Sequence, residues 1–129
     1  MVPGLKVVKL AFNNIINLKI YIFKLNMSNA PEGAKIFKAK CSTCHTIEYG
    51  GPNKQGPNLW GILDRKAGKA IGFKYTQANL NSGITWTEEA LVEYLKNPKK
   101  YIKGTNMAFP GFKKEIDAKN VVEFLKYFK

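Results

Sequence analysis

Both cysteines of the chain and its only histidine lie in one short segment, Cys41-Ser42-Thr43-Cys44-His45. The C-x-x-C-H pattern is the attachment signature of a c-type haem. The two sulfurs form thioethers with the haem, and the imidazole takes one axial position on the iron. On a helical turn Cys41, Cys44 and His45 share one face, because residues three and four apart are neighbours. The segment can therefore hold the edge of a flat macrocycle and turn a nitrogen toward its centre.

Three other cysteine chemistries fit this segment less well. A structural zinc ion needs four ligands, usually Cys or His, and the chain has only three such residues. A thioredoxin-like dithiol belongs in a strand-helix unit, and the flanking sequence shows no strand pattern. A disulfide between Cys41 and Cys44 would close too small a loop to add much stability. One covalently attached haem is the main prediction, and these three remain the alternatives.

We expect the second axial ligand of the iron to be Met107. It lies in the run Lys103–Gly111, where flanking glycine and proline residues indicate a loop. If the body of the chain begins at Met27, Met107 is its only internal methionine. A lone methionine is most often core filler, and that interpretation stays open. Met/His ligation raises the reduction potential and fills the iron site, which favours electron transfer over reactions with oxygen or peroxide.

Length and charge bound the remaining possibilities. A chain of 129 residues allows one domain, and its 45% hydrophobic residues can bury a small core that a haem would help to complete. The formal net charge of +12 favours anionic partners such as acidic proteins or anionic lipid. We expect no nucleic-acid binding, because no reading module is recognisable.

Residues 1–26 differ from the rest of the chain. They hold four of the 21 basic residues and none of the nine acidic ones. The longest uncharged stretch, Leu10 to Leu18, is nine residues with three asparagines, too short and too polar to span a bilayer. Two interpretations stay open: a basic amphipathic helix for targeting or membrane-surface binding, or a non-native translated segment ahead of a start at Met27. We therefore predict an extension over 1–26 and one domain over 27–129.

The body is predicted to be mostly α-helical. A first helix is expected over Ala30 to Lys40, running into the Cys-His segment. A second begins at the capping-box sequence Thr85-Trp86-Thr87-Glu88 and is stopped by Asn97-Pro98. A third covers roughly Ile116 to Phe128, where apolar residues recur at helical spacing. Between the first two, Tyr49 to Gly83 is rich in Gly, Pro and Asn, so we expect it to wrap a group that supplies the missing core.

From about Met27 to Lys129 the residues closely resemble the mitochondrial cytochrome c family of class I c-type cytochromes. The resemblance implies the cytochrome c fold, three to five helices and loops wrapped around one covalently attached haem c. Two departures from the family's pattern are Lys103 in place of proline and Asn106 in place of lysine, beside Met107. The matching motifs are Cys41-Ser42-Thr43-Cys44-His45-Thr46, Gly56-Pro57-Asn58-Leu59, Gly83-Ile84-Thr85-Trp86, Asn97-Pro98-Lys99-Lys100-Tyr101-Ile102 and Gly104-Thr105-Asn106-Met107.

The resemblance also implies a set of haem contacts. Cys41 and Cys44 would carry the thioethers, and His45 and Met107 would be the axial ligands. Among the remaining contacts, one would orient the axial histidine, one would lie beside the methionine sulfur, and several would bind the propionates or cover the haem edge. In that order they are the Pro57 carbonyl, Tyr94, the propionate donors Thr105, Tyr75, Asn79 and Trp86 with Arg65 offsetting the charge, and Phe109 at the edge.

Two further features follow from the same resemblance. Gly33 would let the first helix approach the last one closely, with Phe37 and Phe124 packed at the crossing. A ring of lysines would surround the haem edge and bind acidic surfaces on partner proteins; these are Lys35, Lys40, Lys54, Lys99, Lys100, Lys113 and Lys114.

The function implied is that of a monomeric, soluble one-electron carrier of the respiratory chain, and not of an enzyme. It would pass electrons from cytochrome c reductase to cytochrome c oxidase in the mitochondrial intermembrane space. The alternative is peroxidase-like activity or a cell-death signalling role, either of which would need Met107 to leave the iron.

Overall fold

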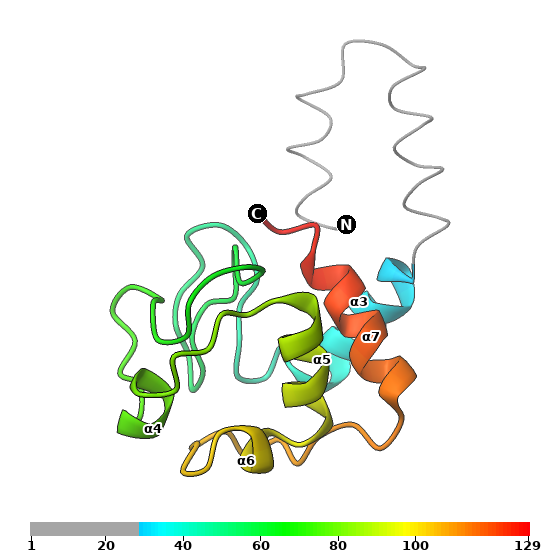
Figure 1. Ribbon diagram of the computed structural model, residues 1–129. Coiled ribbons are helices and arrows are strands. Elements are labelled where there is room, and N and C mark those ends of the chain that lie inside the picture. Colours follow the sequence, from blue (N-terminus) through cyan, green and yellow to red (C-terminus); the bar gives the residue numbers. More distant parts are fainter. Residues whose placement is uncertain (1–28) are drawn as a thin grey trace.

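The computed structural model describes residues 29–129, so the extension predicted over 1–26 lies outside the described part. Five helices are present there: α3 (Ala30–Lys40), α4 (Gln77–Leu80), α5 (Glu88–Lys96), α6 (Pro98–Tyr101) and α7 (Glu115–Leu125), shown in Figure 1. The described residues contain no strand, only an isolated antiparallel bridge between Lys66 and Thr85. The prediction of a mostly helical fold with three to five helices is confirmed. None of the helices in residues 29–129 is long and apolar enough to cross a membrane.

Helix α3 has the bounds that the sequence predicts. Pro31 lies in its first turn beside Glu32, and Lys38 and Lys40 lie in its last turn. This charge order complements the helix dipole, since acids stabilise the positive end and bases the negative end. Its buried residues, Ala30, Gly33 and Phe37, recur at helical spacing on one face.

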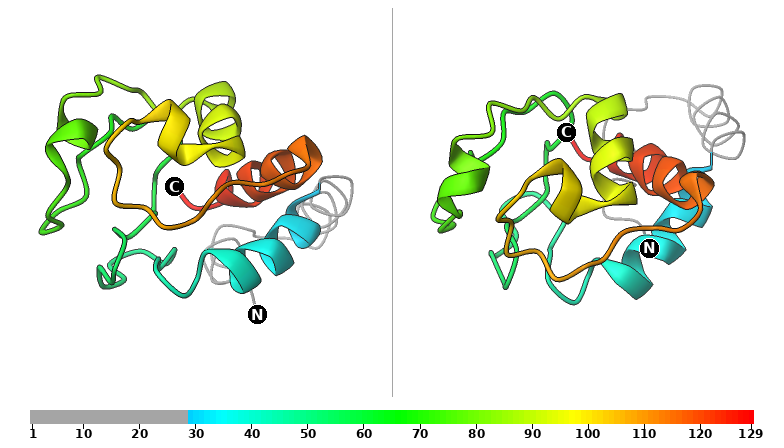
Figure 2. Two further views of the ribbon diagram at one scale, coloured as in Figure 1. Left: turned by 90° about the horizontal axis from the view of Figure 1, so that it is seen from below. Right: turned by 60° about the horizontal axis from the view of Figure 1, so that its bottom comes forward.

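That face packs against α7, and the two helices lie side by side in Figures 1 and 2. A Cβ atom on Gly33 would overlap the backbone carbonyl of Asn120. The rings of Phe37 and Phe124 meet at the same crossing with centroids 5.4 Å apart. The expected close crossing is therefore present, and it fixes the end of α3 from which the Cys-His segment continues.

The start of α5 differs from the prediction. The capping-box interpretation made Thr85 the cap, but the side chain of Thr87 accepts the N–H of Ala90 at 3.1 Å and caps the helix. Thr85 instead pairs with Lys66 in the isolated bridge. The physical reason is local: Thr87 has two glutamates in the following turn, and their charges stabilise the positive end of the helix there.

The end of α5 agrees with the prediction, but the next helix was not anticipated. Helix α5 ends at Lys96, with Asn97 as its C-cap. The Asn97 side chain then accepts the N–H of Lys100 at 3.2 Å and caps α6, which begins at Pro98. Proline ends one helix but suits the first turn of the next, because that turn needs no N–H donor.

Helices α5 and α7 are antiparallel neighbours joined at both ends by lysines. Lys96 at the end of α5 lies 3.1 Å from Glu115 at the start of α7. Lys126, just after α7, lies 2.8 Å from Glu88 at the start of α5. Helix α7 spans Glu115–Leu125, so the predicted end at Phe128 was three residues too late. Phe128 is nonetheless fully buried, and its ring lies 6.1 Å from that of Trp60.

The segment from Tyr49 to Gly83 is mostly loop, as its composition predicts, apart from the four-residue α4. Helix α4 lies on the opposite side of the fold from the α3–α7 pair in both figures. Thr76 caps it by accepting the N–H of Asn79 at 3.1 Å. The loops thus extend the structure well beyond the helix pair, and the candidate site lies between these parts.

Candidate functional site

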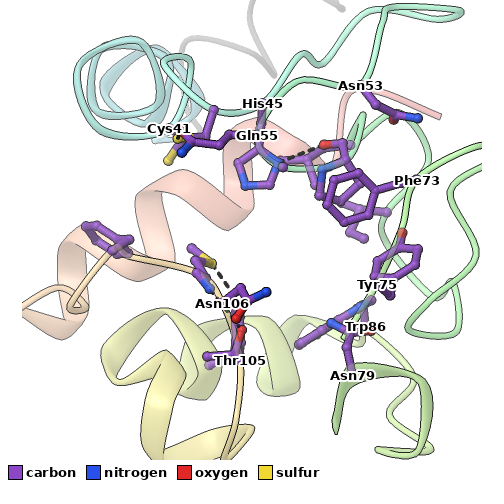
Figure 3. A pocket seen from close by; sticks show the side chains of 18 of the residues that line it. Cys41, His45, Asn53, Gln55, Phe73, Tyr75, Asn79, Trp86, Thr105 and Asn106 are labelled. Carbon is purple, nitrogen blue, oxygen red and sulfur yellow. Dashed lines mark hydrogen bonds between the residues drawn. The ribbon is translucent and has the colours of Figure 1, made fainter. Parts of the chain in front are cut away.

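A cavity of about 570 Å³ is enclosed between the Cys-His segment, the long loop, α5, α7 and the Met107 loop. Most of its walls are apolar side chains, which suits a ligand site of this size. Figure 3 shows the side chains that face it. The apolar stripes of α5 and α7 that the sequence singled out contribute Leu91, Tyr94, Leu95, Val121 and Leu125.

Cys41 and Cys44 lie on one turn that continues α3. The N–H groups of Cys44 and His45 both donate to the Cys41 carbonyl, at 3.1 and 3.0 Å. Both cysteines are free thiols and both line the cavity. Burial, with a smaller contribution from Cys44, raises the pKa of the Cys41 thiol to about 11. The two sulfurs and the His45 ring therefore reach the same cavity from one turn, as the attachment of a macrocycle requires.

The ring of His45 is fixed by the segment that follows the turn. Its Nδ1 atom lies 2.7 Å from the Pro57 carbonyl oxygen. A carbonyl only accepts, so Nδ1 carries the proton and Nε2 keeps its lone pair. Burial lowers the pKa of His45, and the bond to Pro57 opposes that effect less strongly. A Cβ on Gly56 would overlap the ring, so only glycine fits there. His45 is thus a neutral, oriented imidazole with a free nitrogen.

Met107 lies on a loop across the cavity from His45, as the positions of Thr105 and Asn106 in Figure 3 show. The Tyr94 hydroxyl donates to the Met107 sulfur at 2.8 Å. Burial raises the pKa of Tyr94, with a smaller opposing effect of its hydrogen bond to Thr105, so the hydroxyl keeps its proton. The Met107 N–H donates to the Thr105 hydroxyl at 3.2 Å. These contacts hold the thioether against the cavity.

The far end of the Met107 loop is anchored to α5. The N–H of Phe112 donates to the Leu95 carbonyl at 2.8 Å. Gly111 has φ of +110°, and a Cβ there would overlap the Lys96 carbonyl. Both contacts keep the loop close to the C-terminal end of α5, the helix that carries Tyr94.

The predicted propionate-binding residues form a polar wall of the same cavity. Figure 3 shows Tyr75, Asn79 and Trp86 together on one side. Within residues 29–129, the buried Arg65 Nε and Asn79 Oδ1 atoms have no hydrogen-bond partner. A half-turn of the Asn79 amide exchanges its oxygen and nitrogen, so this residue can donate to a carboxylate. The wall therefore lacks polar partners where the carboxylates of a haem would supply them.

The same wall is held in place by its other contacts. The Arg65 guanidinium donates to the Trp60 carbonyl at 2.8 Å, and burial lowers its pKa. The Tyr75 hydroxyl accepts the N–H of Ala70 at 2.9 Å. The Trp86 ring is buried and lies 4.8 Å from the Tyr94 ring.

Phe109 also lines the cavity, and its ring lies 4.8 Å from that of Phe112. All seven lysines of the predicted docking ring are exposed. Two of them, Lys40 and Lys54, line the cavity as well.

Two contributors were missed by sequence reasoning. Asn53 accepts the N–H of Asn58 at 2.8 Å, and the Asn58 amide donates to Thr46 Oγ1 at 2.8 Å. These bonds shape the loop that presents the Pro57 carbonyl to His45. The only sequence signal was the motif Gly56-Pro57-Asn58-Leu59, which marks the loop but not its partners.

The residues present fit a haem better than a structural metal ion. Within the described chain no group of three or more His, Cys, Asp or Glu side chains is placed to hold a metal. The site instead offers two thiols, a neutral imidazole, a thioether, apolar walls and a polar wall with unpaired groups. Each part matches one feature of a thioether-linked iron macrocycle.

Comparison with known proteins agrees with this site. A family model described as "Cytochrome c" matches residues 30–129. Curated proteins named "Cytochrome c" are 51% identical over 94 residues in Kluyveromyces lactis and 52% identical over 98 residues in Theileria parva. A third, from Gossypium barbadense, is 49% identical over 98 residues. The alignments cover 73%, 76% and 76% of this chain, and 86%, 84% and 88% of those proteins.

Proposed function

Because the chain belongs to the cytochrome c family and is therefore an electron carrier with a covalently attached haem c, we propose that it holds the iron with His45 and Met107. In this proposal it carries single electrons from cytochrome c reductase to cytochrome c oxidase in the mitochondrial intermembrane space. When bound, the haem supplies an iron that changes between its ferric and ferrous states.

The observation that carries the ligand assignment is the preparation of both side chains. His45 presents an unprotonated Nε2 because Pro57 holds the proton on Nδ1. Met107 presents a sulfur that the Tyr94 hydroxyl fixes at 2.8 Å. Neutral imidazole and thioether are the ligands that raise a haem's reduction potential, as an electron carrier needs.

Cys41 and Cys44 would hold the haem covalently. Each thiol would add across one vinyl group, so that the sulfur bonds to carbon and its proton passes to the other vinyl carbon. The raised pKa of Cys41 keeps that proton on the sulfur at neutral pH.

The exposed lysines support the choice of partners. Lys40 and Lys54 lie at the cavity, and Lys99 and Lys100 follow the Asn97 cap on α6. A basic surface steers a protein toward acidic docking sites, at rates that fall with rising salt. A redox encounter of this kind needs only a small, short-lived interface.

The ligand assignment is tested by the absorption spectrum of the haem-loaded protein. The oxidised protein should show the Met–iron charge-transfer band, and Met107→Leu should lose it at nearly unchanged side-chain volume. Asn106→Ala, in the same loop, is the matched control and should retain the band. An oxidised parent protein without the band would contradict the assignment.

The partner assignment is tested by electron-transfer kinetics. Replacing Lys99 and Lys100 by Glu should slow the reaction with oxidase several-fold at low salt and have little effect at high salt. Lys129→Glu makes one of the same charge changes at the chain end and serves as the control. Equal effects at both places would show that net charge, rather than this surface, governs docking.

Peroxide or lipid chemistry is the less favoured alternative, because it needs Met107 to leave the iron. The hydrogen bond from Tyr94 and the anchored Gly111 both oppose that departure. A parent protein with peroxidase activity as high as that of Met107→Leu would favour the alternative.

A further inference from the structure

Three hydrogen bonds connect the ring of His45 to an exposed turn of the long loop. His45 Nδ1 lies 2.7 Å from the Pro57 carbonyl oxygen. The N–H of Asn58 donates to Asn53 Oδ1 at 2.8 Å. The Asn53 Nδ2 group donates in turn to the Ile71 carbonyl at 2.9 Å. We call this series, His45 to Pro57–Asn58 to Asn53 to Ile71, the amide relay.

The relay is continuous because its bonds meet on shared amide groups. The Pro57 carbonyl and the Asn58 N–H belong to one peptide group, which accepts on one side and donates on the other. The Asn53 side-chain amide does the same with its oxygen and its nitrogen. All three bonds therefore point the same way, from the ring toward the turn, and bonds in such a chain polarise one another by roughly 10–30% each.

The far end of the relay lies at the surface. The side chain of Ile71 is 96% exposed, and Gly72, which follows it, has φ of +77°. A Cβ on Gly72 would lie 3.8 Å from Asn53 Nδ2, so the turn packs directly beside the relay amide. The turn also carries the exposed Lys69 and Lys74 on either side of Ile71.

We propose that Asn53 is a positioning residue that sets the strength of the hydrogen bond on His45 and couples it to the turn at Ile71. The proposal rests on His45 being the axial ligand, as argued above. A stronger bond on Nδ1 makes the imidazole a better electron donor, as partners of metal-bound histidines generally do. An electron-rich ligand stabilises the ferric state, so the intact relay lowers the reduction potential.

An amide suits this role because it does not titrate. The coupling through Asn53 keeps the same donors and acceptors across the physiological pH range, unlike a relay through histidine. A molecule that binds the Ile71 turn and displaces its carbonyl would weaken the bond on His45 from the protein surface.

The experiment compares four variants of the haem-loaded protein. Asn53→Ala removes both relay bonds of the side chain, and Gly72→Ala disturbs the turn, because alanine disfavours its positive φ. Ile71→Ala keeps the backbone carbonyl and is the first control. Asn81→Ala is the second, since it loses one comparable amide bond, from Gln77 at 2.9 Å, away from the relay.

Two quantities are measured: the ferric-to-ferrous ratio at fixed potential and the proton resonance of the His45 ring N–H in the ferrous protein. Asn53→Ala should lower the ratio about two- to threefold, equivalent to a rise of about 18–28 mV at 59 mV per tenfold. The ring N–H resonance should move upfield, as for a weaker hydrogen bond. Gly72→Ala should shift both in the same direction by less, and both controls should match the parent.

The outcomes separate this proposal from the proposed function. A parent protein without the His/Met absorption spectrum would overturn the function itself. A parent with that spectrum, and an Asn53→Ala protein with unchanged potential and ring resonance, would overturn the relay alone, even if amide exchange over residues 66–76 became faster. If Asn53→Ala does not fold, an unchanged Gly72→Ala protein would overturn the coupling.

Discussion

Gly33 in α3 packs directly on the backbone carbonyl of Asn120 in α7, with no room for a side chain between them. Gly33→Ala should therefore destabilise the protein by about 1–3 kcal/mol, as overpacking does. This sign is informative, because alanine favours a helix over glycine by about 0.5–1 kcal/mol when space is available. Unfolding in denaturant, followed by circular dichroism, measures the change.

Gly50→Ala is the matched control for that change. Gly50 has φ of +71°, and a Cβ atom added there would have no neighbour within 4 Å, so only backbone strain is added. A Gly33→Ala protein as stable as the parent would show that the two helices can separate at this point.

Tyr94→Phe should lower the reduction potential. The change removes the donor 2.8 Å from the Met107 sulfur, which then gives more electron density to the iron and stabilises the ferric state. We expect a shift of about 20–60 mV, since 59 mV corresponds to a tenfold change for one electron. Tyr101→Phe, whose ring lies 6.1 Å from that of Tyr94, is the control and should leave the potential in place.

Glu115→Gln should remove a pH-dependent part of the stability. Its hydrogen bond and charge interaction with Lys96 hold the pKa of the Glu115 carboxyl below its ordinary value. A lowered carboxyl pKa stabilises the fold above the ordinary carboxyl range, and this contribution is lost as the pH falls through the lowered pKa.

The unfolding midpoints of the parent and the Glu115→Gln protein should therefore differ at neutral pH and converge in acid. The difference should also shrink in high salt, because the pair is exposed. Glu89→Gln, an exposed acid in α5, is the comparison. A difference that persists at low pH would mean that Glu115 acts through packing rather than charge.

A Cys41→Ala, Cys44→Ala double variant should fail to fold at room temperature. Without the covalently held group, a cavity of about 570 Å³ is left among the walls of the core. At about 24 cal/mol per Å³, its cost is on the order of 10 kcal/mol, comparable to the whole stability of a small domain, about 5–15 kcal/mol. Far-ultraviolet circular dichroism should show little helix. Cys44→Ala alone, which keeps one thioether, should retain the helical signal.

The helices were predictable where local chemistry decides them. The bounds of α3 and the end of α5 at Asn97-Pro98 followed from a proline, a charge order and an apolar stripe. Helices α4 and α6 were missed because four residues give no periodicity. The cap of α5 was placed at Thr85 instead of Thr87 because two threonines two residues apart offer the same hydroxyl.

The candidate site was predictable where covalent attachment demands fixed spacing. Cys41, Cys44 and His45 share a turn, and no other residues of the chain could play these parts. The contacts of Asn53 could not be predicted, because its two partners, Asn58 and Ile71, are five and 18 positions away. Such bonds depend on how two irregular loops meet, and no periodicity in the sequence encodes that meeting.

The burial of His45 has a consequence for the surface. Histidine is the only side chain whose ordinary pKa lies near neutrality, and the single histidine here is inside, with a lowered pKa. The surface of the described residues therefore lacks the residue type that changes charge between about pH 5 and 8. Acidification of the surroundings would leave its lysine charges as they are, so the attraction to an acidic partner would respond only to the partner's own titration.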